Sequence, residues 1–241
     1  MEAALHLAAR SGSARAVTRL VDFGASVDVF AAAETHMHNF VMLPTIELRT
    51  PLMWAAVRGF VGVAEALLKA KANVNITDHE GATALFLASG WGHTETVQCL
   101  LSFKADVDVS DEGGRTALFI ASERGHDEIV KARVGAGADL NKATSDGMTA
   151  LFAAAELGRT DIVKTLVAAK CDVEAADRCL RTPLLQASLR GHTGVVRVLV
   201  EEGRANAGAV DDTGRTPLSV ATARGLSEIV HNSESKRLIA N

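Results

Sequence analysis

Tyrosine is absent from the 241-residue sequence, and aromatic residues together make up only 4% of it. Proteins that bind single-stranded nucleic acid stack bases on exposed aromatic rings, so this scarcity argues against that class. The formal net charge is −4, from 25 basic and 29 acidic residues. This balance gives no general attraction to nucleic acid or to anionic lipid. The composition therefore disfavours nucleic acid as a partner.

Cysteine is scarce as well, with only Cys99, Cys171 and Cys179. An odd number of cysteines without CxxC spacing argues against a disulfide framework and against a zinc site. No stretch approaches the roughly 18 to 20 apolar residues that cross a membrane. The N-terminal segment MEAALHLAAR lacks the basic start and long apolar run of a signal peptide. We therefore expect a cytoplasmic or nuclear protein that does not bind membranes.

Sequence patterns of catalysis are also missing. There is no GxxxxGK[ST], GxSxG or HExxH motif, and no GxGxxG after a strand. The stretch DVDVSDEGG from Asp106 resembles a calcium loop, but it has Asp111 where glycine is needed and Ala117 where glutamate is needed. His36 and His38 form an HxH pair without a cysteine or an acidic cluster nearby. We expect no enzymatic activity, no cofactor, no metal site and no small-molecule substrate.

What the sequence does contain is an internal repeat. The segment Thr-Ala/Pro-Leu recurs in steps of 33, 33, 33, 33 and 34 residues, with its leucine at Leu52, Leu85, Leu118, Leu151, Leu184 and Leu218. An earlier unit, ALHLAARSGSARAVTRLV, carries the same pattern around Leu5, 47 residues before Leu52, so an insertion separates them. These registers predict one domain with repeats at about 1–31, 46–78, 79–111, 112–144, 145–177, 178–211 and 212–241, and an insertion at 32–45.

Each repeat has the pattern of two short helices. A threonine before the first helix can act as its N-cap, and Pro51, Pro183 and Pro217 occupy the first helical position. A glycine in a left-handed conformation is expected to end that helix, at Gly12, Gly59, Gly92, Gly125, Gly158, Gly191 and Gly225. Apolar pairs such as Ile129-Val130 line one face of the second helix. Because such a helix pair cannot bury its apolar face alone, neighbouring pairs must stack.

These residues resemble the ankyrin-repeat family, whose signature runs D-x-x-G-x-T-P-L-H-x-A-A-x-x-G-H, followed by an apolar pair and a GA turn. The resemblance covers nearly the whole chain outside residues 32–45. It implies an all-α solenoid of stacked helix-turn-helix units with short β-turn tips, in which the tips and first helices form a concave face. It also implies a non-catalytic module that binds another protein as a scaffold, adaptor or inhibitor. The alternative is the substrate-recognition portion of a larger enzyme or ubiquitin-ligase-type assembly.

Several residues depart from the family pattern. Phe86, Phe119 and Phe152 replace the histidine of the signature, and we interpret them as a packing ladder, with a hydrophobic ligand groove as the alternative. Arg133 stands where other complete repeats have leucine, so we expect its guanidinium to reach solvent and the fourth repeat to be weak. The insertion 32–45 is a passive surface loop, a partner-binding finger or an artefact of the gene model.

The expected partner-binding positions, taken from the family's geometry, are the tips and the residues just before each helix-ending glycine. Arginine is prominent there, which predicts a mildly basic groove and an acidic or phosphorylated partner segment, unless the arginines serve solubility alone. Trp91 is the best candidate for an anchor, the alternative being packing on a neighbouring repeat, whereas Trp54 is expected in the core. The predicted site residues are Arg58, Trp91, Arg115, Arg124, Met148, Leu157, Arg181, Arg190, Arg215 and Arg224.

Overall fold

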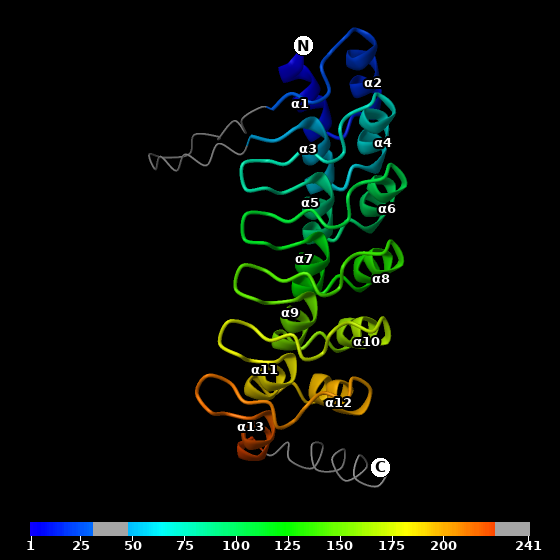
Figure 1. Cartoon of the computed structure of the whole chain (residues 1–241). Coiled ribbons are helices and arrows are strands. Elements are labelled where there is room, and N and C mark those ends of the chain that lie inside the picture. The colour runs from blue at the N-terminus through cyan, green and yellow to red at the C-terminus, as the bar shows by residue number, and fades with distance from the viewer. Residues whose placement is uncertain (31–47, 225–241) are drawn as a thin grey trace, which may run out of the picture. The chain divides into compact units, whose positions relative to one another are not determined.

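The chain is helical almost throughout the part that the structure describes, which is residues 1–30 and 48–224 of a computed structural model (Figure 1). Between repeats, an isolated antiparallel β-bridge joins Thr77 and Thr83. The fold class is all-α, as predicted. The helices of the described residues are α1 (Glu2–Arg10), α2 (Ala14–Asp22), α3 (Pro51–Arg58), α4 (Val61–Lys69), α5 (Ala84–Trp91), α6 (Thr94–Ser102), α7 (Ala117–Arg124), α8 (Asp127–Gly135), α9 (Ala150–Glu156), α10 (Thr160–Ala168), α11 (Pro183–Arg190), α12 (Thr193–Glu201) and α13 (Pro217–Ala223).

These helices belong to two compact units, unit 1 over residues 1–112 and unit 2 from residue 113 onward. In unit 1 the first helices of successive repeats, α1, α3 and α5, pack in order, and so do the second helices, α2, α4 and α6. In unit 2 the same holds for α7, α9, α11 and α13, and for α8, α10 and α12. In each unit the tip loops lie on one side of the first helices and the second helices lie on the other (Figure 1).

The first helices begin as the sequence predicts. The side chain of Thr50 accepts a hydrogen bond from the backbone N–H of Met53, three residues into α3. The same cap is made by Thr83, Thr116, Thr149, Thr182 and Thr216. Proline occupies the first turn of α3, α11 and α13, where its missing N–H leaves no hydrogen bond broken. Local chemistry therefore fixes where each of these helices starts.

The predicted glycines end the first helices in the left-handed conformation. Gly59 caps α3 with φ 71°, and the caps at Gly92, Gly125 and Gly191 are alike. An added Cβ at Gly59 would lie 2.5 Å from Nδ1 of His93 in the next repeat, so this position needs glycine for space as well as for conformation. Gly12 and Gly158 are also left-handed, one residue after the caps Ser11 and Leu157. Gly225 lies outside the described residues.

The core of each unit consists of side chains that recur at the repeat period. The repeated leucine of the first helix is buried from Leu5 to Leu184, and the second helices bury Leu67 and Leu100 in unit 1. Phe86, Phe119 and Phe152 are all buried, so the packing interpretation holds and they do not line a ligand groove. Trp54 is buried too, as expected, beneath the guanidinium of Arg10 at 4.9 Å from the ring centroid.

Arg133 contradicts the expectation drawn from its sequence position. We expected its guanidinium to reach solvent, but the side chain is 0% exposed. In α8 it occupies the repeat position at which other repeats have Leu67, Leu100, Leu166 and Leu199, and these leucines are fully buried as well. The expectation was wrong because this register faces the packed interior, from which the length of an arginine side chain does not reach the surface.

An aspartate side chain closes several of the tips, and Thr144 closes the tip of the fifth repeat, where its Oγ1 accepts a hydrogen bond from the Met148 N–H. Oδ1 of Asp177 accepts hydrogen bonds from the backbone N–H groups of Cys179 and Arg181, and Asp78 and Asp211 close their tips in the same way. Backbone hydrogen bonds then join neighbouring tips, with the Arg178 N–H donating to Asp146 and the Asp212 N–H donating to Cys179. Asp78, Asp177 and Asp211 therefore have a structural role in their tips, as the sequence indicates.

Two predictions concern residues outside the described ranges. The insertion 32–45, with His36 and His38, is one of them. The other is the last part of the seventh repeat, after Arg224. The described ranges therefore bear on neither prediction.

Candidate functional site

One surface position recurs at the end of the first helices. The residue that precedes the repeated glycine after the first helix is exposed in each described repeat, and in the first six repeats that glycine is left-handed. We call these residues the exposed row. Its members are Ser11, Arg58 and Trp91 in unit 1, and Arg124, Leu157, Arg190 and Arg224 in unit 2.

In unit 1 the row ends in a large aromatic side chain. Trp91 is 57% exposed, whereas the other residues of α5, Ala84 to Gly90, are all buried. Arg58 holds the same position one repeat earlier and is also exposed. The packing alternative for Trp91 thus accounts for less than half of its surface, and the remainder is exposed.

In unit 2 the row carries a large aliphatic side chain at the same repeat position. Leu157 is 45% exposed, while α9 buries every residue from Ala150 to Ala155. Arg124 and Arg190 flank it in the sequence of repeats, and both are exposed. An exposed apolar side chain thus stands at the repeat position between those of two exposed arginines.

The remaining predicted site residues lie at the tips of unit 2 and at the end of α13. Arg115 and Arg215 are exposed, whereas Met148 and Arg181 are half-buried. Arg224, at the end of α13, is exposed. The tip loops that carry these residues lie on the side of the first helices that faces away from the second helices (Figure 1).

Several predicted arginines are already paired with carboxylates of the same unit. Nη2 of Arg181 lies 2.5 Å from Oδ2 of Asp177, and Nη2 of Arg215 lies 2.7 Å from Oδ2 of Asp211. The guanidinium of Arg181 also lies over the ring of Phe152, 6.0 Å from its centroid. The hydrogen bond to Asp177 raises the pKa of Arg181 above its ordinary value. These two arginines stabilise the tips and carry little uncompensated charge.

Asp211 shows how strongly a tip holds its carboxylate. Loss of hydration alone would raise its pKa, but the opposite effect dominates. The backbone N–H and guanidinium of Arg215, with the hydroxyl and N–H of Thr213, donate to the carboxylate and hold its pKa well below the ordinary value. Asp211 therefore stays ionised to a lower pH than an ordinary aspartate would.

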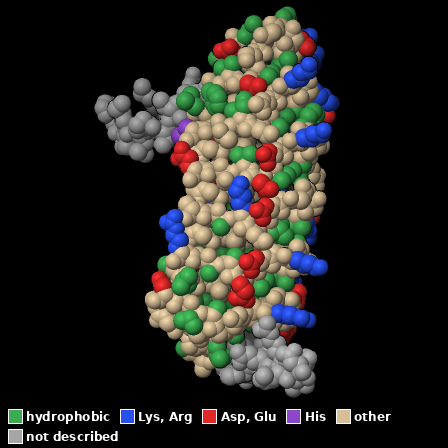
Figure 2. Space-filling model, viewed as in Figure 1, with side chains coloured by type: hydrophobic (Ala, Val, Ile, Leu, Met, Phe, Trp, Pro, Cys, Tyr) green, Lys and Arg blue, Asp and Glu red, His purple; other side chains and the backbone are tan. Residues whose placement is uncertain are grey.

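Arg190 is paired as well, in a small polar cluster beside Leu157. Its Nη2 lies 2.5 Å from Oε1 of Glu156, and the same oxygen accepts a hydrogen bond from Nε2 of Gln186 at 2.9 Å. Nε2 of His192 is within 2.8 Å of the backbone oxygen of Glu156. On the face shown in Figure 2, most basic side chains lie along the right edge, and acidic side chains are prominent along the middle.

Leu180 is a surface residue that the sequence analysis missed. It sits at the tip of the sixth repeat, is 56% exposed and has φ 58°, a left-handed conformation that costs a non-glycine residue about 1–2 kcal/mol. The other described tips have glycine at this position, as at Gly81, Gly147 and Gly214. A leucine where the other repeats have glycine could therefore have marked Leu180 as unusual from the sequence alone.

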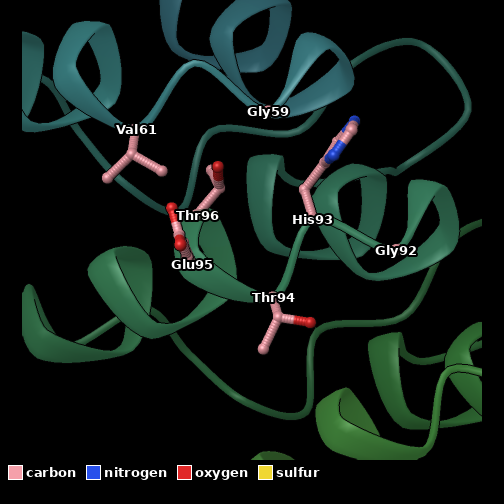
Figure 3. Close-up of a pocket in the computed structure, with 7 residues that line it drawn as sticks. All are labelled: Gly59, Val61, Gly92, His93, Thr94, Glu95 and Thr96. Carbon is pink, nitrogen blue, oxygen red and sulfur yellow. The ribbon is translucent and has the colours of Figure 1, made fainter.

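The structure also has a shallow polar depression in unit 1, shown in Figure 3. Its volume is about 270 Å³, and it is lined by Gly59, Val61, Gly92, His93, Thr94, Glu95 and Thr96. Nε2 of His93 is 2.9 Å from the backbone oxygen of Val57, so the ring is already engaged in packing two repeats together. Sites for small molecules are usually larger, at roughly 300–1,000 Å³, and mostly apolar. We assign no ligand to this depression.

Among residues 1–30 and 48–224, no three His, Cys, Asp or Glu side chains gather as a metal site would require. In the same residues, no helix combines the length and the apolar character that crossing a membrane demands. The exposed row with its flanking tips is the surface that we consider as the candidate site.

Comparison with known proteins agrees with this geometry. A family model described as three copies of the ankyrin repeat matches residues 2–78, 52–144, 103–177 and 169–232. No curated protein sequence matches the chain. Among solved structures, the chain is similar to the ankyrin repeat domain of Bcl-3, described as a unique member of the IκB protein family. The identity is 27% and the TM-score 0.80, over 95% of this chain and 97% of that one. The chain therefore belongs to the ankyrin-repeat family.

Proposed function

We propose that this chain binds another protein through the exposed row, as a scaffold, adaptor or inhibitor, and that it catalyses no reaction. The observation that carries the proposal is the exposure of Trp91 and Leu157 at one repeat position, where the neighbouring apolar side chains are buried. Burying a large apolar side chain contributes about 1.5–3 kcal/mol. Because Trp91 and Leu157 stay largely exposed in the folded chain, folding gains only part of this burial energy. A partner that covered the two side chains would gain the rest.

The family supports the proposal at a coarser level. Ankyrin repeats are generally protein–protein interaction modules, and the similar Bcl-3 domain comes from a protein described as an IκB-family member. The three cysteines, Cys99, Cys171 and Cys179, form no disulfide. Free thiols fit a reducing compartment, so we propose the cytoplasm or the nucleus as the place of action.

We further propose that the bound segment is acidic or phosphorylated, recognised by arginines of the exposed row. Arg58 and Arg124 hold equivalent exposed positions in the two units. Arg181 and Arg215 are paired within their tips and Arg190 is paired with Glu156, so we expect these three to contribute less. Arg58→Gln should weaken binding more than Arg181→Gln does, and more strongly at low salt than at high salt. Equal losses for the two variants would reject the acidic-segment proposal.

Site-specific photo-crosslinking tests the protein-binding function. A benzophenone amino acid is placed at position 91 or 157 of the whole chain, and at Phe103 as a control, since Phe103 is a half-buried aromatic residue at the end of the second helix α6. In extract of the native cell, we expect one protein to crosslink from positions 91 or 157 and not from position 103. Crosslinks only from Phe103, or to nucleic acid, would overturn the proposal.

A further inference from the structure

The tip of the sixth repeat, in unit 2, carries a side chain that the fold of the tip does not need. The Leu180 N–H donates a hydrogen bond to the backbone oxygen of Asp177 at 2.9 Å, which closes the turn. In the tip of the fifth repeat the Gly147 N–H donates the same hydrogen bond to Thr144, also at 2.9 Å. Glycine therefore closes the turn as well as leucine does, and the leucine side chain adds nothing to that hydrogen bond.

Leucine is also the less suitable residue at this position, in conformation and in space. Leu180 has φ 58°, in the left-handed region that a bulky residue rarely adopts. At the equivalent position one tip earlier, a Cβ added to Gly147 would lie 3.2 Å from Cα of Asp177. A Cβ added to Gly114 would lie 2.9 Å from the backbone nitrogen of Ser145. Both distances run to the backbone of the next tip in unit 2, so this repeat position leaves little room for a side chain.

Burial within the chain does not compensate for this strain. Leu180 remains 56% exposed, so folding removes less than half of its surface from water. The charged neighbours are paired, since Nη1 of Arg178 lies 3.4 Å from Oδ1 of Asp146. Arg181 is paired with Asp177. Leu180 is thus an exposed apolar side chain among compensated charges, and residues held in strained conformations concentrate at functional sites.

The exposed row lies at the other end of the helix that follows this tip. Helix α11 runs from Pro183 to Arg190, directly after the tip, and Arg190 belongs to the exposed row (Figure 1). At a rise of 1.5 Å per residue, its 8 residues span about 12 Å. A protein interface of ordinary size buries about 800 Å² on each partner, which is enough to cover both ends of such a helix. One partner can therefore cover the exposed row and Leu180 together.

We propose that Leu180 is a specificity-determining residue of the binding surface, which inserts into an aliphatic pocket of the partner that covers the exposed row. This inference rests on the proposed function and adds a contact that the row itself does not make. An apolar pocket is the fitting counterpart, because the charges of Arg178 and Arg181 are compensated and the leucine gains free energy by burial. The third, fourth, fifth and seventh repeats have glycine at this position, so the contact is particular to the sixth repeat.

The test measures affinity and stability on the same variants of the whole chain. The probe is the protein that crosslinks from position 91 or 157. Leu180→Gly should bind this protein about tenfold more weakly, because the apolar contact is lost. Its urea midpoint should rise, because glycine relieves the strain. Leu180→Met keeps a long apolar side chain and should bind within about twofold of the unsubstituted chain.

A matched control moves the leucine to the neighbouring tip. Gly214 is left-handed too, with φ 81°, and a Cβ added there would meet no atom of the described residues within 4 Å. The double variant Leu180→Gly with Gly214→Leu therefore carries the same side chain, in the same kind of strained backbone, on the tip of the seventh repeat. Its affinity for the probe should stay as low as that of Leu180→Gly.

Trp91→Ala and Leu157→Ala, measured with the same probe, separate this proposal from the proposed function. Full affinity in Leu180→Gly, with a loss in either of the row variants, would overturn the role of Leu180 and leave the proposed function standing. Full affinity in all three variants, or no crosslinked protein at all, would overturn both. Restored affinity in the double variant would also overturn the role of Leu180, because a leucine on another tip would then suffice. A lower affinity of Leu180→Gly together with a lower urea midpoint would do the same, because the leucine would then be structural.

Discussion

Replacing Arg133 by leucine is expected to stabilise the protein. Arg133 is 0% exposed in the register where Leu67, Leu100, Leu166 and Leu199 lie. Placing a charged group in the interior incurs a desolvation penalty of several kcal/mol, which the interactions of Arg133 within the fold offset in part. Leucine at this register contributes about 1.5–3 kcal/mol of apolar burial without that penalty. Since buried charged groups replaced by apolar residues give changes from zero to about 4 kcal/mol, we expect Arg133→Leu to add about 1–3 kcal/mol.

Urea unfolding followed by far-ultraviolet circular dichroism measures this change, because helices of both units contribute to the signal. Tryptophan fluorescence comes from Trp54 and Trp91, both in unit 1, and so separates the response of that unit from the response around Arg133. The matched control is the reverse change one repeat later, Leu166→Arg, which should destabilise by about 3–5 kcal/mol. If Arg133→Leu instead lowered the free energy of unfolding by more than about 1 kcal/mol, the interactions of Arg133 would outweigh its desolvation and the reasoning would be refuted.

Three further substitutions or reactions are expected to behave as follows. Leu180→Gly should raise the free energy of unfolding by about 1 kcal/mol in urea titration, because glycine adopts φ 58° without strain; a loss of stability would contradict this. Ser89→Ala should raise the free energy of unfolding by about 1 kcal/mol, because the buried Ser89 hydroxyl makes no hydrogen bond with the described residues. Ser122→Ala should lower the free energy of unfolding, because Oγ of Ser122 donates a hydrogen bond to the backbone oxygen of Leu118. A change of the same sign in both variants would refute the explanation. Burial raises the pKa of Cys171 to about 11, so at pH 7.5 iodoacetamide should label it far more slowly than Cys179, with a rate that rises with pH up to about 11; equal rates would contradict this.

Features that depend on local chemistry could be read from the sequence, and the structure confirms them. The threonine before each first helix and the glycine after it act within one turn, so Thr50 and Gly59 could be assigned from their spacing alone. The exposure of Trp91 and Leu157 was expected from the geometry of the ankyrin-repeat family at these positions, and the structure has both side chains exposed.

Features that depend on a neighbouring repeat were harder to read. The burial of Arg133 is decided by packing of the whole α8 face and not by the preference of arginine for solvent. The pairing of Arg190 with Glu156 joins two repeats, and no local spacing reveals it. By contrast, Arg181 follows Asp177 by four residues within one tip, so that ion pair was available in the sequence.

The most direct test of the central claim is the dissociation constant of the crosslinked partner for the whole chain and for Trp91→Ala, Leu157→Ala and the control Phe103→Ala. We expect at least one of the first two variants to bind about 30-fold or more weakly, as for an interface anchor of about 2 kcal/mol, with the helical content and unfolding midpoint unchanged. Phe103→Ala should bind as the unsubstituted chain does. Full affinity in both row variants, with a loss confined to Phe103→Ala, would contradict the assignment of the exposed row as the binding surface.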